Sequence, residues 1–241
     1  MTVRLDFYLA TNTRLSRKEA RRHIQAGEVS IDGVVCRKSA THISADQQVH
    51  WQDEAIELAG ERYLMLNKPA GVVSAREDRD HPTVLDLLPP DECAGLHIVG
   101  RLDMDTTGLL LLTTDGQWSH RITSPKSHCP KTYRAQLAEP LSEEAHAALE
   151  RGVQLKDELR PTAPASLSAI GPDGIELTIT EGRYHQVKRM LAAVGNHVTA
   201  LHRVRIGGIR LDESLAPGQY RALSAKEIAS AGRQGSAPVS C

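Results

Sequence analysis

The sequence has few of the features that mark secreted or membrane-spanning proteins. Its 241 residues include only four cysteines, scattered at Cys36, Cys93, Cys129 and Cys241 with no C-x-x-C pair. This pattern offers no disulfide framework and is typical of a reducing compartment. No apolar run approaches the length of a membrane span, and the first residues lack the apolar core of a signal peptide. We therefore expect a cytoplasmic protein with no membrane partner.

Aromatic side chains and net charge are also scarce. Aromatics make up 3% of the chain, so the core must consist mainly of Leu, Val, Ile and Ala, and aromatics in polar surroundings such as Tyr133 and Tyr184 stand out. The formal net charge is −1. A nucleic-acid role therefore cannot be inferred from overall charge and has to be sought in local clusters.

Motifs for nucleotide cofactors and for metals are missing. The sequence contains neither a G-x-G-x-x-G stretch that opens a βαβ unit nor a G-x-x-x-x-G-K-[ST] phosphate loop. Its histidines and cysteines match no common zinc-binding spacing. We expect neither a cofactor nor a metal site.

Residues 1–57 have the pattern of a small separate unit. Ser16 and Glu19 match a capping box, and the helix that they begin is predicted to end at Gly27. Asp32 and Gly33 stand between two short β runs, which is a strong hairpin signal. Residues 58–62 read as a polar linker, residues 63–231 as a larger unit, and residues 232–241 as a disordered tail.

The helix that follows Ser16 is strongly basic. Between Arg14 and Arg22, five basic residues accompany one acid. A solvated helix face would explain this pattern, but clustered Arg and Lys are also the footprint of phosphate binding. We predict that the helix contacts an RNA or DNA backbone through Arg17, Lys18, Arg21 and Arg22.

Strands outnumber helices in the larger unit. Strands are predicted at Tyr63 to Leu66 and in "GLLLLTTDG", "KTYRAQL", "ASLSAI", "IELTIT" and "HVTALHRVRIGGI". Helices are predicted in "HPTVLDLLP", "SEEAHAALERG" and "YHQVKRMLAAVG". The frequent hairpin signals favour an α+β fold with a mainly antiparallel or mixed sheet flanked by helices.

The stretch "VGRLDMDTTGLLLLTTDG" places two carboxylates, Asp103 and Asp105, beside four consecutive leucines. The D-x-D spacing could hold a divalent metal, but two ligands do not make a site. We interpret Asp105, with Thr106, Thr107 and Gly108, as a turn or cap. Asp103 is expected to pair with Arg101 or another base, which would keep the carboxylate ionised in a cleft.

Basic residues recur near the C-terminal end of the larger unit. "GRYHQVKRM" reads as the start of a helix, whose first-turn amides also favour anions. A solvated surface is the alternative interpretation. We predict phosphate contacts by Arg183 and Arg189.

Several of these stretches occur together in one known family. The chain resembles the RsuA family of pseudouridine synthases in "LNKPAGVVS", "GRLDMDTTGLLLLTTDG", "KTYRAQL" and "EGRYHQVKRM", taken in that order. Residues 1–57 resemble the small S4 RNA-binding domain that precedes the catalytic domain in this family. The resemblance implies isomerisation of a uridine in 16S ribosomal RNA, with position 516 expected. A large-subunit uridine, or a non-catalytic S4-type protein that binds ribosomal RNA, are the alternatives.

The resemblance also implies roles for individual residues. Asp103 matches the essential aspartate and Tyr133 a tyrosine that packs on the target base. Lys188 stands where relatives place a basic residue, often Arg, that pairs with the aspartate, and Arg189 is its rival. Arg101 matches a residue that fills the gap left by a flipped uridine. No cofactor or metal is implied; the implied partner is 16S ribosomal RNA or a small-subunit assembly intermediate, bound by a monomer.

One motif remains ambiguous at this level. Asn67 and Lys68 match a motif that supports the floor of the cleft, but a simple junction between a strand and a turn explains them equally well. The resemblance and the residues alone leave both interpretations open.

Overall fold

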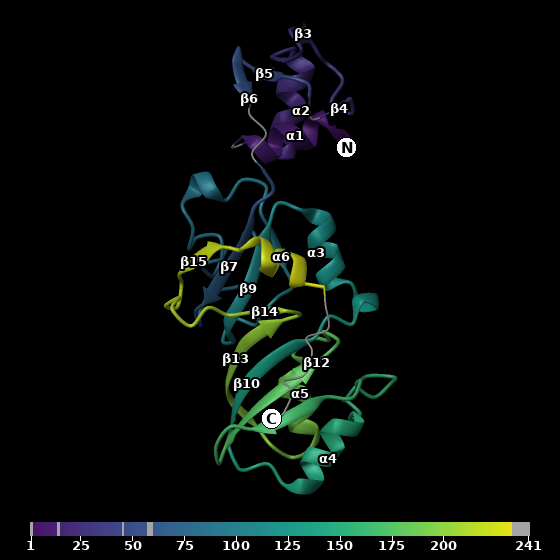
Figure 1. Cartoon of the computed structure of the whole chain (residues 1–241), viewed down its shortest axis with the longest axis vertical. Coiled ribbons are helices and arrows are strands. Elements are labelled where there is room, and N and C mark those ends of the chain that lie inside the picture. The colour runs from purple at the N-terminus through teal and green to yellow at the C-terminus, as the bar shows by residue number, and fades with distance from the viewer. Residues whose placement is uncertain (1, 14, 45, 57–59, 233–241) are drawn as a thin grey trace. The chain divides into compact units, whose positions relative to one another are not determined.

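The computed structural model describes residues 2–13, 15–44, 46–56 and 60–232 (Figure 1). The chain forms two compact units. One contains the chain up to Arg62 together with Leu88–His97, and the other contains Tyr63–Leu87 and the chain from Ile98 onward. Residues 57–59 and the tail from 233 lie outside the described residues, so the linker and tail boundaries stay predictions.

The N-terminal unit contains two helices and two small antiparallel sheets. The helices are α1 (Leu5–Asn12) and α2 (Arg17–Ala26). Strand β1 (Thr2–Arg4) pairs with β4 (His42–Ser44). The second sheet has the order β3-β2-β5-β6, formed by β2 (Val29–Ile31), β3 (Val34–Val35), β5 (Val49–Trp51) and β6 (Glu54–Ile56). A 3₁₀ turn, η1 (Pro90–Glu92), belongs to the same unit.

Local sequence signals explain the geometry of this unit. Ser16 and Glu19 form both hydrogen bonds of the predicted capping box, and Gly27 ends α2 in the left-handed region with a φ of 84°. Asp32 and Gly33 both have positive φ, as a two-residue hairpin turn requires. These predictions are confirmed. The helices and strands share one apolar core, which includes Leu5, Leu9, Ala20, Ile24, Ile43 and Val49.

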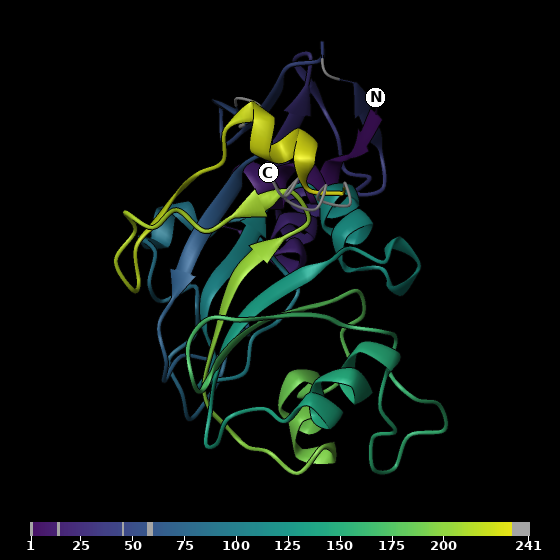
Figure 2. The ribbon, with the colours of Figure 1, turned by 60° about the horizontal axis from the view of Figure 1, so that its bottom comes forward.

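The larger unit is organised around one nine-stranded sheet. Its main order is β11-β12-β10-β13-β9-β7-β15, with β14 paired to β13 and β8 paired to β9. The strands are β7 (Tyr63–Lys68), β8 (His97–Val99), β9 (Thr107–Thr113), β10 (Lys131–Leu137), β11 (Ser166–Ala169), β12 (Gly174–Ile179), β13 (Val198–Ile206), β14 (Ile209–Arg210) and β15 (Tyr220–Ala222). Strands β13 and β9 run parallel, and the other described registers are antiparallel. The mixed sheet confirms the predicted α+β class (Figure 2).

Helices cover the two halves of this sheet separately. Near β7 and β9 lie α3 (Gly116–Thr123) and α6 (Ala225–Ser230), whose Trp118, Ile122 and Ile228 join one apolar cluster. Near β10 and β12 lie α4 (Glu143–Arg151) and α5 (Gln186–Ala193), which supply Leu149, Val187 and Leu191 to a second cluster. A 3₁₀ turn, η2 (Pro125–Ser127), follows α3.

Two of the predicted helices differ from the structure. The stretch "HPTVLDLLP" forms turns instead of a helix: Thr83 bridges to Val73, whose N–H donates to the Pro82 carbonyl and whose carbonyl accepts from the Val84 N–H, so the backbone bonds outside the stretch override its helical pattern. Helix α5 begins at Gln186, two residues later than predicted. His185 has a φ of 46° and a ψ of 36°, so the helix cannot extend through it.

One buried carboxylate holds the basic helix of the N-terminal unit in place. Asp6 is fully buried, and its oxygens lie 2.9 Å from Arg21 Nε, 3.0 Å from Arg4 Nη2 and 3.4 Å from Arg17 Nη2. Burial alone would raise the pKa of Asp6, but the hydrogen bonds from the arginines outweigh it and hold this pKa well below its ordinary range. Asp6 therefore stabilises the unit in its ionised form.

We expect Asp6→Asn to lower the free energy of unfolding of the N-terminal unit by about 2 kcal/mol at pH 7, because three arginines lose their common counter-ion. The folded pKa lies below the unfolded value of about 3.9, so this stabilisation is present above that pH and is lost as the pH falls further. Urea unfolding, followed by Trp51 fluorescence in a Trp118→Phe background, measures it. The exposed Asp53→Asn is the control, and an equal loss in both variants would contradict the prediction.

Candidate active site

A cavity of about 540 Å³ lies in the larger unit where loops meet the strands of the central sheet. Its lining comes from the segments 100–104, 123–125 and 179–188, together with Tyr133 on β10 and Arg203 on β13. Its size is that of a pocket for a small organic ligand or one nucleoside. Asp103, Tyr133, Lys188, Arg101 and Arg183, all predicted from the sequence as site residues, line this one cavity.

Asp103 stands on a tight turn that enters the most buried strand of the sheet. The Thr106 N–H donates to the Asp103 carbonyl over 3.1 Å and closes the turn. Leu102 on one side is buried, and Leu109–Leu112 on the other are fully buried in β9. The leucines thus anchor the turn, while the Asp103 side chain stays 30% exposed in the cavity.

Two side chains of the "GRYHQVKRM" stretch hold the Asp103 carboxylate. His185 Nε2 lies 3.3 Å from Oδ1, and Lys188 Nζ lies 3.4 Å from Oδ2. Of the two alternatives that we expected for Asp103, Arg101 or another base, the structure has the other base; the Arg101 side chain is exposed at the rim of the cavity. The left-handed backbone of His185 turns its ring toward Asp103, and such unusual backbone geometry is often found at functional sites.

Lys188 is shared between the two aspartates. Its ammonium lies 2.6 Å from Asp105 Oδ1, which is closer than Asp103. This hydrogen bond lowers the pKa of Asp105, whose side chain is 70% exposed. Asp105 lies in the turn as predicted, and in addition anchors the base that faces Asp103. Arg189, the alternative to Lys188, instead donates hydrogen bonds to Glu158 and to the Lys156 carbonyl. The geometry therefore selects Lys188 as the partner of Asp103.

A buried lysine fixes the backbone that carries both aspartates. Lys68 ends β7 fully buried, and its Nζ donates to the carbonyls of Pro69, Met104 and Thr106 over 2.9 to 3.2 Å. Three carbonyls match the three N–H donors of an ammonium group. Burial lowers the pKa of Lys68 to about 8, opposed by the charges of Asp105 and Asp103. Asn67 donates to the Leu215 carbonyl, which does not line the cavity, so only Lys68 of this pair contacts the turn that carries the aspartates.

Sequence reasoning missed two residues of the site, His185, which contacts Asp103, and Arg203. Arg203 is buried with 2% of its surface exposed, and its guanidinium contacts the Arg101 carbonyl and the Tyr133 hydroxyl. Its burial could have been predicted from the stretch "TALHRVRI", because the alternation of a strand places Arg203 on the same inward face as Leu201. Charged residues are rarely fully buried unless they are paired.

An exposed aromatic side chain stands next to the acid. The Tyr184 ring is 76% exposed and stacks on the His185 ring, with centroids 3.8 Å apart and planes inclined by 20°. Because His185 contacts Asp103, the stack lies at the edge of the cavity. Exposed aromatic faces of this kind can stack on nucleobases.

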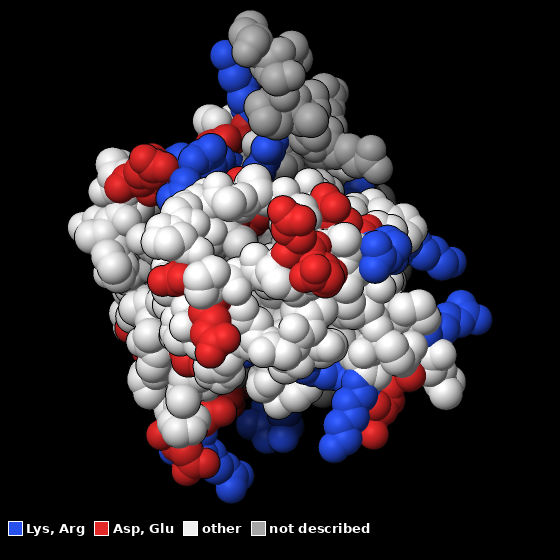
Figure 3. All heavy atoms as spheres, turned by 90° about the horizontal axis from the view of Figure 1, so that it is seen from below, with Lys and Arg blue, Asp and Glu red and all other residues white. Residues whose placement is uncertain are grey.

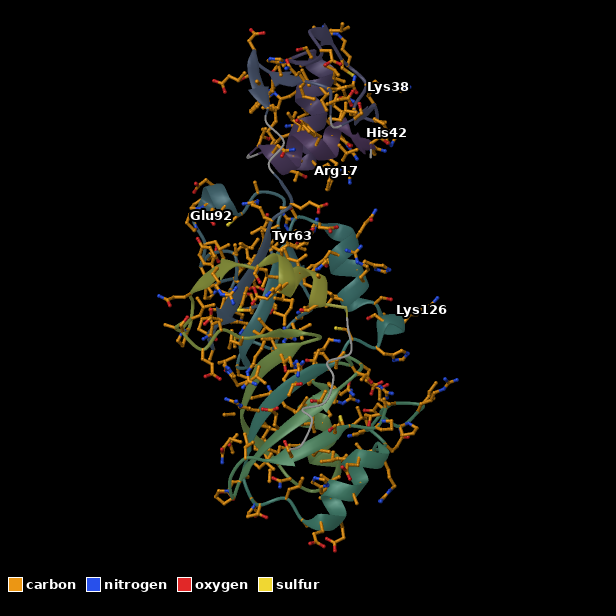
Figure 4. The ribbon with its side chains drawn as sticks, viewed as in Figure 1. Arg17, Lys38, His42, Tyr63, Glu92 and Lys126 are labelled. Atoms are coloured by element: carbon orange, nitrogen blue, oxygen red, sulfur yellow. The ribbon has the colours of Figure 1, made fainter. Side chains whose placement is uncertain are left out.

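The remaining predicted RNA contacts have different surroundings. The Arg183 guanidinium donates hydrogen bonds to the Glu181 carboxylate and to the carbonyls of Arg160 and Pro161. Arg17, labelled in Figure 4, and Arg21 pair with Asp6 yet stay half exposed. Lys18 and Arg22 are exposed on the same helix. These four lie in the N-terminal unit and outside the cavity.

The charge on the surface agrees with the near-neutral composition. On the face shown in Figure 3, acidic and basic side chains are interspersed, with no single large patch of one sign. Within the described part of the chain, no group of three or more His, Cys, Asp or Glu side chains is placed to hold a metal ion. None of the helices described is both long and apolar enough to pass through a membrane.

Known proteins share both the sequence and the fold. Residues 62–193 match the RNA pseudouridylate synthase family, and residues 3–49 match the S4 domain. "Ribosomal small subunit pseudouridine synthase A" of Yersinia pestis is 51% identical over 231 residues, covering 95% of this chain and 98% of the relative. The protein of the same name from Escherichia coli K12 is 51% identical, covering 95% and 99%. A crystal structure titled as a pseudouridylate synthase matches with a TM-score of 0.70 and 46% identity, covering 95% of this chain and 99% of that one.

The lysine beneath the aspartates generates a prediction. Lys68→Met should lower kcat by about 100-fold, because three buried carbonyls lose their donor and the turn that carries Asp103 is no longer held. It should also cost about 3 kcal/mol of stability. Turnover and urea unfolding of the variant measure the two effects. Lys226→Met on the exposed face of α6 is the matched control, and a Lys68→Met enzyme with unchanged kcat would refute the role.

Proposed function

The chain belongs to the RNA pseudouridylate synthase family, and we propose that it isomerises one uridine of 16S ribosomal RNA, at position 516, to pseudouridine. The observation that carries this proposal is Asp103, whose carboxylate is held by His185 and Lys188 in a cavity of nucleoside size. The small-subunit target is supported by the names of the two relatives that share half of the sequence.

The proposed reaction moves a glycosidic bond without adding or removing atoms. The N1–C1′ bond breaks, the uracil turns within the cavity, a C5–C1′ bond forms, and the proton from C5 is lost while N1 gains one. No redox partner is required by this balance. One carboxylate can start the reaction, either as a nucleophile or as a base that removes a sugar proton. Asp103 is the candidate, because Asp105 is exposed and bound to Lys188.

Base flipping is part of the proposal. Chemistry at C1′ and C5 requires the uridine to leave the stack and enter a pocket. Tyr133 lines the cavity wall, and its proposed role is to pack on the flipped base. Arg101 is exposed at the rim, and its proposed role is to fill the gap left in the RNA. The Tyr184–His185 stack offers a surface for a base next to the target.

The N-terminal unit is proposed to bind the RNA backbone. Helix α2 offers Lys18 and Arg22, with Arg17 and Arg21 also half exposed, and Asp6 neutralises only part of this charge. In the larger unit, Arg183 and Arg189 are proposed to bind phosphate through the guanidinium N–H groups that do not donate hydrogen bonds within the protein. The match to an S4 domain supports the assignment of the first unit.

The partner proposed is 16S ribosomal RNA or a small-subunit assembly intermediate, and the proposed location is the cytoplasm. We propose that the protein binds this RNA as a monomer. No cofactor enters the reaction as proposed.

Asp103→Asn should abolish pseudouridine formation, with a fall in kcat of about 1,000-fold or more, because an amide can act neither as nucleophile nor as base. Binding of the RNA should change little. Asp105→Asn is the matched variant, and it should keep measurable turnover because only its bond to Lys188 is lost. The assay is mass spectrometry of nucleosides from small-subunit and large-subunit ribosomal RNA after incubation with each protein.

The same assay separates the alternatives. Pseudouridine that forms in large-subunit RNA alone would replace the proposed target, and wild-type protein that binds RNA without turnover would indicate a non-catalytic binding protein. An active Asp103→Asn enzyme would refute the role of the carboxylate. Activity that disappears on strong chelation and returns with a divalent metal would support a metal-dependent transferase.

Lys18→Gln combined with Arg22→Gln should weaken RNA binding and reduce its dependence on salt. Each lost phosphate contact lowers the slope of log K against log salt concentration by about 0.7 to 0.9. These two positions are preferred to Arg17 and Arg21, whose removal would also disturb Asp6. Filter binding between about 50 and 200 mM salt measures the slope. Lys226→Gln is the charge-matched control, and equal slopes for both variants would exclude α2 from the interface.

A further inference from the structure

Arg203 is a buried cation without an anion. Its residue surface is 2% exposed, and among the residues that the structure describes no carboxylate lies within ion-pairing distance of its guanidinium. Nη2 is buried and has no hydrogen-bond partner within the described chain. A buried charge in this state is costly, and such a cost is expected to persist where it serves the function of a site.

The contacts of Arg203 join the two halves of the cavity. Nε donates to the Leu109 carbonyl over 2.8 Å, and Nη1 donates to the Arg101 carbonyl over 3.2 Å. Both carbonyls belong to the segment that carries Asp103. Nη1 also lies 3.5 Å from the Tyr133 hydroxyl oxygen, and the guanidinium carbon lies 5.9 Å from the centre of the Tyr133 ring. One side chain therefore connects the aspartate segment to the tyrosine.

The sheet register creates this arrangement. Arg203 lies opposite Tyr133 in the antiparallel pair of β13 and β10, and beside Gly108 in the parallel pair of β13 and β9. Gly108 has a φ of 100°, and a Cβ there would collide with the backbone of Arg203. A glycine is thus required for the close approach of β13 to the strand that follows Asp103.

The hydrogen bond to Tyr133 has a direction. A guanidinium can only donate, so the Tyr133 oxygen accepts from Arg203 and its own hydrogen is available to another acceptor. Tyr133 lines the cavity with 8% of its surface exposed, which leaves the ligand space as the place for that acceptor. The surrounding charge is positive, because Lys131 also lines the cavity and Lys68 lies behind the turn.

We propose that Arg203 is a positioning residue that holds Tyr133 as a hydrogen-bond donor to a uracil carbonyl and stabilises the negative charge that develops on the base as its bond to the sugar breaks. The proposal rests on the function proposed above and deepens it. Cleavage of N1–C1′ leaves the bonding electrons on the uracil, and addition of a nucleophile to the ring also places charge on its carbonyl oxygens. A fixed donor and a nearby cation lower the energy of either state.

Arg203→Gln tests the charge, Arg203→Lys restores it without the planar fork, and Tyr133→Phe removes only the hydroxyl. We expect Arg203→Gln to lower kcat by about 100-fold with less than about a threefold change in KM. The kcat of Arg203→Lys should be about tenfold higher than that of Arg203→Gln. The double variant with Tyr133→Phe should be about as slow as the slower single variant, because the two side chains act on the same oxygen.

A second substrate separates electrostatic from structural loss. 16S RNA transcribed with 5-fluorouridine carries a base from which fluorine withdraws electrons. Negative charge on this base is already partly stabilised, so stabilisation by the protein contributes less to the rate. The rate at which the target nucleoside disappears in single turnover, measured by mass spectrometry, should then differ between wild type and Arg203→Gln by about tenfold instead of about 100-fold. A residue that only supports the fold would cause the same loss on both RNAs.

Each outcome is decisive. Equal losses on the two substrates, additive effects of the two residues, or an unimpaired Arg203→Gln enzyme would overturn the inference. If Arg203→Gln does not fold by circular dichroism, the same comparison of substrates is made with Arg203→Lys, whose smaller loss should also shrink on the fluorinated RNA; an unchanged loss would overturn it. Wild-type protein that forms no pseudouridine in unmodified RNA would refute the proposed function itself, which distinguishes the two failures.

Discussion

The three hydrogen bonds of the buried Lys68 ammonium are the interaction on which the site depends. Lys68 lies opposite Gly108 in the antiparallel pair of β7 and β9, so its side chain reaches under the turn that precedes β9. The carbonyls of Met104 and Thr106 that it holds flank Asp105 and follow Asp103 directly. Without this cation the turn would expose several carbonyls to an apolar interior. With it, a carboxylate can stand in a cavity on backbone that belongs to the core of the sheet.

The same cation belongs to an unusual distribution of charge. Lys68, Arg203 and Lys131 lie partly or wholly inside the larger unit, and burial lowers the pKa of both lysines. The acids nearby, Asp103 and Asp105, are at least partly open to solvent and both pair with Lys188. The interior side of the cavity is therefore positive. Such a cavity suits an anionic polymer and a base that gains negative charge during reaction.

Local sequence signals were sufficient for much of the fold. The capping box at Ser16, the hairpin at Asp32 and Gly33 and the alternation in "KTYRAQL" all depend on neighbouring residues, and the structure confirms them. The stretch "HPTVLDLLP" was assigned wrongly because its backbone bonds to Val73, outside the stretch, instead of forming the hydrogen bonds of a helix. The start of α5 was misplaced because the contact of His185 with Asp103 comes from a segment far away in the chain.

By itself, the sequence determined the family, the α+β class and the placement of basic residues on α2, and it predicted Asp103 as the reacting carboxylate, because these depend on the order of residues along the chain. Only the tertiary structure decided the partners of each charge. Asp103 pairs with His185 and Lys188 instead of Arg101, Arg189 turns to Glu158, and Arg203 lies buried behind Tyr133. The physical reason is that charges act over a few ångströms in space, and the register of β9, β10 and β13 sets which of them meet.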